Sequence, residues 1–211
     1  MRKVLEFGGF IAGAVLVIFG VVVIALGISG RSTVQSNLSQ EKIVGSDDMT
    51  PALIKVAADQ AGLVGVTLPT CDVAGKSIDT GSEARCFAQY MRIHALEASG
   101  GLTYAELGRY ATADGSPKGT NDATAAVQAD GRPVANAVRN TWVTETALGT
   151  ALNMGYMAEQ LSLFSIVIGV ALLLTGIGFV VLDWVALHRR RAAEEAKTVA
   201  ATQTPIKPLT A

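Results

Sequence analysis

The sequence predicts an all-α membrane protein in which two transmembrane helices flank a mainly helical extracytoplasmic domain. Residues 7–28 and 161–182 are apolar runs that carry no charged side chain. As a helix, each run would be about 33 Å long, enough to cross a hydrocarbon core of about 30 Å. Half of the 211 residues are hydrophobic and only 6% are aromatic, and the apolar excess is concentrated in these two runs.

Basic residues beside the two runs predict which side of the membrane each end occupies. Arg2 and Lys3 precede the first run, and three arginines, 189–191, follow the second. Such charges stay on the cytoplasmic side, so both termini are expected there. The expected boundaries are a cytoplasmic N-terminus at 1–6, spans at 7–28 and 161–187, an extracytoplasmic domain at 29–160, and a disordered cytoplasmic tail at 188–211. The alternative, a cleaved signal peptide, fits less well because its apolar core is usually about 7–15 residues long.

Both cysteines, Cys71 and Cys86, lie in the middle segment. An exported segment meets an oxidising compartment, where a disulfide is stable, so we expect these two residues to pair. The alternative is a pair of buried free thiols. Residues 31–160 hold ten Lys or Arg against fourteen Asp or Glu, a net charge of −4. Nucleic-acid binding needs a basic surface, and this balance argues against it.

Small residues recur every seven positions in both apolar helices. The strips are Gly13, Gly20 and Gly27 in the first, and Ser162, Gly169 and Gly176 in the second. Seven residues make nearly two helical turns, so each strip lies along one helix face. Membrane helices pack closely at such strips, which predicts a tightly crossed antiparallel hairpin or a homo-oligomer through the same faces.

Local signals divide the middle segment into short elements. The polar stretch 29–42 is expected to continue the first helix or to form a stalk. Thr50 or Asp48 with Pro51 should begin a helix that ends near Gly62. Further expected elements are a strand or extended link at 63–68, helices at 82–98 and 104–111, the latter capped by Thr103, and a loop with little fixed structure at 113–133.

From about residue 134, helix formers run without a proline into the second span, so a continuous helix is expected. An apolar face is predicted on its outer part, formed by Val143, Ala147, Ala151, Met154, Ala158 and Leu161. This face should pack on the rest of the outer domain or on a partner subunit.

Candidate catalytic chemistry is limited to His94 and Glu97, which share one face of the predicted helix 82–98 with Tyr90. Such a pair could transfer protons or begin a metal site, but one histidine and one carboxylate are too few metal ligands. The preferred interpretation is a packed or exposed helical histidine. We therefore expect no catalytic residue, no metal and no cofactor. His188 is expected to join the basic cluster at the inner membrane surface.

Four stretches carry a resemblance to a known group: KVLEFGGFIAG (3–13), TCDVAG (70–75), ARCFA (84–88) with YMRIHA (90–95), and TWVTETAL (141–148). They resemble a group of small actinobacterial membrane proteins of unknown function, and the resemblance implies a plasma-membrane location. Some members bear an aromatic ring-opening dioxygenase label. A ring-cleaving iron site needs two histidines and a carboxylate together, whereas His94 and His188 are predicted on opposite sides of the membrane.

The functional hypothesis is a non-enzymatic plasma-membrane scaffold or accessory subunit with a disulfide-stapled outer domain. The expected partners are the lipid bilayer and either another protein or further copies of the chain. The alternative is an extracytoplasmic sensor or ligand-binding module that signals through the second span.

Overall fold

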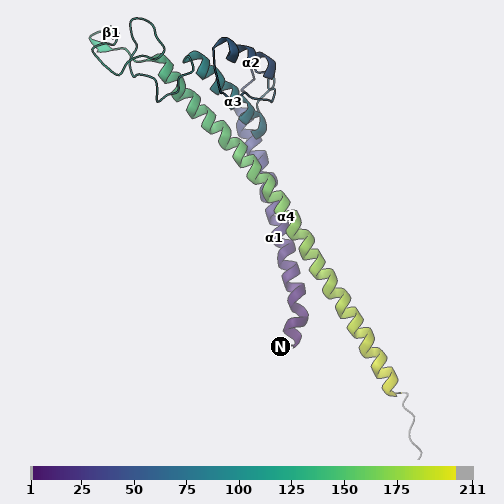
Figure 1. The fold of residues 1–211 in the computed structure, drawn as a ribbon. Coiled ribbons are helices and arrows are strands. Elements are labelled where there is room, and N and C mark those ends of the chain that lie inside the picture. The colour runs from purple at the N-terminus through teal and green to yellow at the C-terminus, as the bar shows by residue number, and fades with distance from the viewer. Residues whose placement is uncertain (1, 203–211) are drawn as a thin grey trace, which may run out of the picture. The chain divides into compact units, whose positions relative to one another are not determined.

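The structure, a computed structural model, describes the backbone of residues 2–202 and the side chains of residues 8–199. In this part of the chain it is mostly helical (Figure 1). The helices are α1 (Arg2–Gln40), α2 (Pro51–Gln60), α3 (Gly81–Ala98) and α4 (Ala137–Thr202), and a small antiparallel ribbon pairs β1 (Gln128–Ala129) with β2 (Arg132–Pro133). The chain divides into two compact units, one of residues 1–28 and 163–211, the other of residues 29–162.

Helices α1 and α4 are long and apolar enough to cross a membrane, over Gly8–Gln40 and Ala137–Val199. This confirms the mainly helical fold with two candidate spans. Helix α4 is continuous over 66 residues, because no proline interrupts the sequence between Pro133 and Pro205. The polar stretch after the first apolar run is helical as far as Gln40, so it continues α1.

In the first unit, glycines let α1 and α4 approach backbone to backbone. A Cβ atom placed on Gly13 would lie 2.8 Å from the backbone oxygen of Gly176, and one on Gly20 would lie 2.8 Å from that of Gly169. Real Cβ atoms do not come so close, so only glycine fits at these crossings. Gly27 is also buried.

In the second unit, α2 and α3 lie side by side and enclose a core with α4 (Figure 1). Thr50 caps α2 by accepting a hydrogen bond from the backbone N–H of Leu53, and Pro51 occupies the first turn, as predicted. Tyr90, Ile93, Trp142 and Leu152 are among the buried residues, as are Ile54, Val73, Ile78 and Leu96.

The predicted disulfide is present and joins Cys71 to Cys86 on α3, with the two Cα atoms 6.1 Å apart. Helix α3 begins one residue before the predicted start. Thr80 and Glu83 form a capping box there, in which each side chain accepts a hydrogen bond from the other residue's backbone N–H. This box satisfies two of the amides that the first helical turn leaves without partners.

The predicted helix at 104–111 is wrong. Thr103 does bond to Glu106, through its N–H and its hydroxyl, but this closes a turn. The backbone beyond it pairs with distant residues: Gly108 N–H bonds to Lys118, and Tyr110 exchanges hydrogen bonds with Thr120. A helix would have to give up these long-range bonds, so tertiary pairing overrides local propensity.

The interpretation of 113–133 as a loop with little fixed structure is also wrong in part. The stretch contains turns and is largely exposed, yet it holds the β1–β2 ribbon and the Tyr110–Thr120 bridge. The amide of Asn136, which is 4% exposed, donates to the backbone oxygens of Gly108 and Pro117. One buried side chain thus fastens the loop at Pro117, and the preceding segment at Gly108, to the start of α4.

The apolar face predicted for α4 between Val143 and Leu161 does not pack on the rest of the second unit. All six of its residues are exposed, with Val143 at 53%, Met154 at 58% and Leu161 at 65%. The opposite face is buried and includes Trp142 and Leu152, together with the carboxylates of Glu145 and Glu159. Trp142 helps to hold this face of α4 toward the core, because its indole N–H donates to the backbone oxygen of Leu102 at 3.0 Å.

Helix α4 also continues through residues 188–202, where a disordered tail was expected. Alanine, glutamate and lysine predominate at 192–197, and these residues have high helix propensity. The remainder of the predicted tail, residues 203–211, lies outside the described residues.

Candidate functional site

His94 lies between two carboxylates from different parts of the second unit. Its Nδ1 is 2.7 Å from Oε2 of Glu97, one turn further along α3. Its Nε2 is 3.4 Å from Oδ2 of Asp48, in the segment before α2, but without hydrogen-bond geometry. The structure therefore joins His94 to Glu97, and the spacing of three residues on one helix explains why.

A hollow of about 330 Å³ opens beside this histidine and is lined by Met91, His94, Ala95, Thr141, Thr144 and Glu145. Glu145 is only 8% exposed, and Thr146 donates its hydroxyl hydrogen to the carboxylate at 3.3 Å. The hollow presents an imidazole and a carboxylate, the minimum for proton transfer. Its remaining polar side chains are the hydroxyls of Thr141 and Thr144.

Tyr90 does not take part in this arrangement, although its position on the helix suggested that it would. Its side chain is fully buried, and its hydroxyl donates to the backbone oxygen of Cys71 at 2.6 Å. Burial, with a smaller effect from the charge of Asp72, raises the pKa of Tyr90 above its ordinary value. The tyrosine therefore supports the disulfide-linked core.

Metal binding needs several ligands that converge on one point. Among the described residues, no group of three or more His, Cys, Asp or Glu side chains is placed to hold an ion. At His94, Asp48 and Glu97 approach opposite edges of the ring, so the three cannot share one centre. His188 belongs to the other unit, where its ring lies 4.3 Å from that of Trp184.

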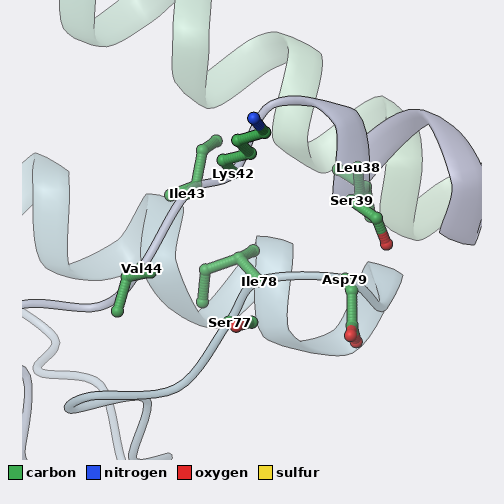
Figure 2. Close-up of a pocket in the computed structure, with 8 residues that line it drawn as sticks. All are labelled: Leu38, Ser39, Lys42, Ile43, Val44, Ser77, Ile78 and Asp79. Atoms are coloured by element: carbon green, nitrogen blue, oxygen red, sulfur yellow. The ribbon is translucent and has the colours of Figure 1, made fainter.

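A second hollow, of about 250 Å³, lies where the chain leaves α1 (Figure 2). Ile43 and Ile78 line it between the segments 42–44 and 77–79, which are joined by a bridge between Val44 and Ser77. The charged ends of Lys42 and Asp79 point in opposite directions in Figure 2. They do not form a joint polar site, so the hollow offers mainly apolar contact.

A buried carboxylate of the second unit, Glu159, contacts two other helices, and the sequence analysis did not single it out. It is 5% exposed. One carboxylate oxygen accepts a hydrogen bond from the backbone N–H of Ser82 at the start of α3, 3.2 Å away, and the other is 3.4 Å from Nε of Arg31 on α1. Gly81 leaves the space, since a Cβ there would lie 2.7 Å from the carboxylate. A single side chain thus joins α4 to α1 and to α3.

Ser162, which was predicted to belong to the strip of small residues on α4, lies close to Gly30 on α1. Ser162 is 8% exposed, and a Cβ atom on Gly30 would lie 2.6 Å from its hydroxyl oxygen.

Sequence reasoning missed Glu145 and Glu159 as buried groups. The available signal was that they are the only charged residues between 140 and 161 and lie fourteen positions apart, nearly four full turns, hence on one helix face.

Comparison with protein-family models, with curated proteins and with solved structures gives no match for this chain.

Proposed function

We propose that this chain is a non-enzymatic scaffold or accessory subunit of the plasma membrane. In this proposal α1 and α4 span the bilayer, both termini are cytoplasmic, and the disulfide-stapled second unit lies outside. The apolar run within each helix supports the membrane assignment, and the disulfide supports an oxidising compartment for the second unit.

The observation that carries the proposal is the inverted polarity of the outer part of α4. Between residues 140 and 161 the only charged side chains, Glu145 and Glu159, face the domain core. The opposite face exposes Val143, Met154 and Leu161, with alanines between them. A helix surface facing water normally carries charge, whereas charged residues are depleted in the centre of protein interfaces.

We infer that an apolar helix of another membrane protein covers this face, which we call the outer α4 face. Over six turns this face carries no charged side chain, so an apolar partner would have no charge to desolvate. Because α4 runs on into a candidate span, a partner helix aligned with it could continue contact along the same element. Such a partner makes the chain an accessory subunit.

The test inserts one charge into the outer α4 face. The full chain, Met154→Lys and the control Gln160→Lys are purified in mild detergent, and the mass and composition of each particle are measured by native mass spectrometry. We expect the unsubstituted chain and Gln160→Lys to retain one companion in fixed ratio, and Met154→Lys to lose it. A particle of identical chains would instead identify a homo-oligomer, and a lone chain in all three samples would refute the interface.

A second candidate function, an extracytoplasmic sensor, is favoured by the Glu159 junction. This carboxylate bonds to α3 and α1 from α4, so a ligand that moved α3 would act on both long helices. The sensor function requires ligand-dependent stabilisation of the second unit without a permanent companion. Thermal unfolding with candidate ligands, monitored on the purified chain, separates it from the accessory subunit.

A further inference from the structure

Residues 64–70 form an irregular stretch, which turns at Gly65, where φ is 75°, and is extended beyond it. Val66 and Leu68 pack toward the core while Thr67 between them is exposed, the alternation of an extended chain. Leu68 precedes Pro69, which favours this conformation. Among the hydrogen bonds of the described residues, none uses a backbone N–H or C=O from 64–70.

A groove of about 480 Å³ separates this stretch from α3. On the helix side, it is lined by Gln89, Arg92, Ile93 and Leu96, which recur at steps of three and four and so share one face. Ile93 and Leu96 are 2% and 6% exposed. The volume lies within the range of about 300–1,000 Å³ found for ligand sites.

Arg92 places a positive charge at this groove. Its side chain is exposed, and its guanidinium carbon lies 5.4 Å from the centroid of the Trp142 ring. Within the described part of the chain, no carboxylate forms an ion pair with it. The stacking limits its motion, while its N–H groups remain able to bind an acidic partner.

We propose that this groove binds an extended, acidic segment of a protein. The segment adds as a strand along 66–68, between Gly65, which has a φ of 75°, and Pro69, where free N–H and C=O groups supply main-chain hydrogen bonds. Alternate apolar side chains of the segment lie over Ile93 and Leu96, and an acidic side chain pairs with Arg92. The groove is distinct from the outer α4 face, so this inference goes beyond the proposed function.

The probes are fluorescently labelled, capped heptapeptides in which valine alternates with threonine and the central residue is Asp, Asn or Lys. Binding to the full chain in detergent is followed by fluorescence anisotropy. We expect the Asp peptide to bind about tenfold more tightly than the Lys peptide, with the Asn peptide between them. A version of the Asp peptide with alternate amides N-methylated should lose binding, because it cannot form the strand hydrogen bonds.

Three variants test whether Arg92 is the residue that recognises the acidic side chain of the peptide. Arg92→Gln should reduce the affinity for the Asp peptide to that for the Asn peptide, and Arg92→Lys should keep the preference for Asp. Arg109→Gln removes an exposed arginine outside the groove and should change nothing. Equal binding of all three peptides, full binding of the N-methylated peptide, or loss of the preference in Arg109→Gln would overturn the proposal.

Peptide binding at the groove can be tested independently of companion binding at the outer α4 face. Met154→Lys should bind the Asp peptide as the unsubstituted chain does. If no peptide binds while the companion is still lost in Met154→Lys, the groove is refuted and the accessory function stands. If the peptide binds and every particle is a lone chain, the groove is supported and the accessory function is refuted.

Discussion

At Glu159 a buried carboxylate on α4 contacts α1 and the first turn of α3, so its removal should be costly. Replacing it by alanine leaves the Ser82 N–H and the Arg31 guanidinium without this acceptor. We expect Glu159→Ala to lower the free energy of unfolding by about 2–3 kcal/mol. Denaturant unfolding followed by circular dichroism measures this, with Gln160→Ala as the exposed neighbour.

A smaller effect is expected for Arg31→Gln, because the Arg31 side chain is 54% exposed and water can replace its partner. An effect of Glu159→Ala no greater than that of Gln160→Ala would show that the junction contributes nothing to stability.

The capping box of α3 predicts a pH dependence at Glu83. Burial alone raises the pKa of this carboxyl group, but hydrogen bonds from the hydroxyl and backbone of Thr80 and from Asp79 outweigh it and lower the pKa below the ordinary value of 4.5. A lowered pKa contributes stability above the ordinary value, and this contribution is lost as the pH falls through the lowered one.

Unfolding midpoints should therefore fall more steeply for the unsubstituted chain than for Glu83→Gln between about pH 5 and about pH 2. Both curves are measured by denaturant titration at a series of pH values. Parallel curves would contradict the assigned role of Glu83.

At the scale of elements, the packing of α1 on α4 within the first unit depends on glycines that face one another. Leucine at Gly20 or Gly169 would place side-chain atoms where the opposing backbone lies. Overpacking of this kind costs about 1–3 kcal/mol or more. We expect Gly20→Leu and Gly169→Leu to lower the melting temperature of the detergent-solubilised chain.

Gly178 on α4 provides the matched control, because a Cβ atom placed there meets nothing within 4 Å. Gly178→Leu should melt like the unsubstituted chain. Equal melting of all the variants would mean that the glycine contacts do not stabilise the helix pair.

An element could be predicted from the sequence when the residues that determine it lie within the element itself. Helix α2 has a local start signal in Thr50 and Pro51, and its prediction succeeded. The failed helix at 104–111 has comparable local signals, but Tyr110 pairs with Thr120 and with Ala135, contacts that no local pattern reveals. Helix α4 has apolar residues at helical spacing on two faces, so periodicity alone could not choose the buried one.

In the candidate site, too, contacts with a local sequence signal could be predicted and contacts between separate elements could not. The Cys71–Cys86 pair was predictable because only two cysteines exist, and Glu97 was predictable as a neighbour of His94 on one helix. The approach of Asp48 to His94 was not, since the two belong to separate elements whose packing fixes their distance. The same holds for the approach of Arg31 to Glu159.

For the whole molecule, the proposed membrane topology requires that the two apolar runs lie in lipid. Only 17% and 11% of their most apolar windows are buried inside the structure, and side chains such as Ile18 and Leu174 are 62% and 64% exposed. Exposing so much apolar surface to water would be unfavourable at about 25 cal/mol per Å². A bilayer would remove this cost.

The most direct test labels single cysteines in intact cells. The described chain has no free thiol, so Ser36→Cys on the outer part of α1 and Ala193→Cys on the last part of α4 each add a unique one. A membrane-impermeant maleimide should label Ser36→Cys in intact cells and Ala193→Cys only after permeabilisation. Labelling of Ala193→Cys alone in intact cells, or of Ser36→Cys only after permeabilisation, would contradict the account.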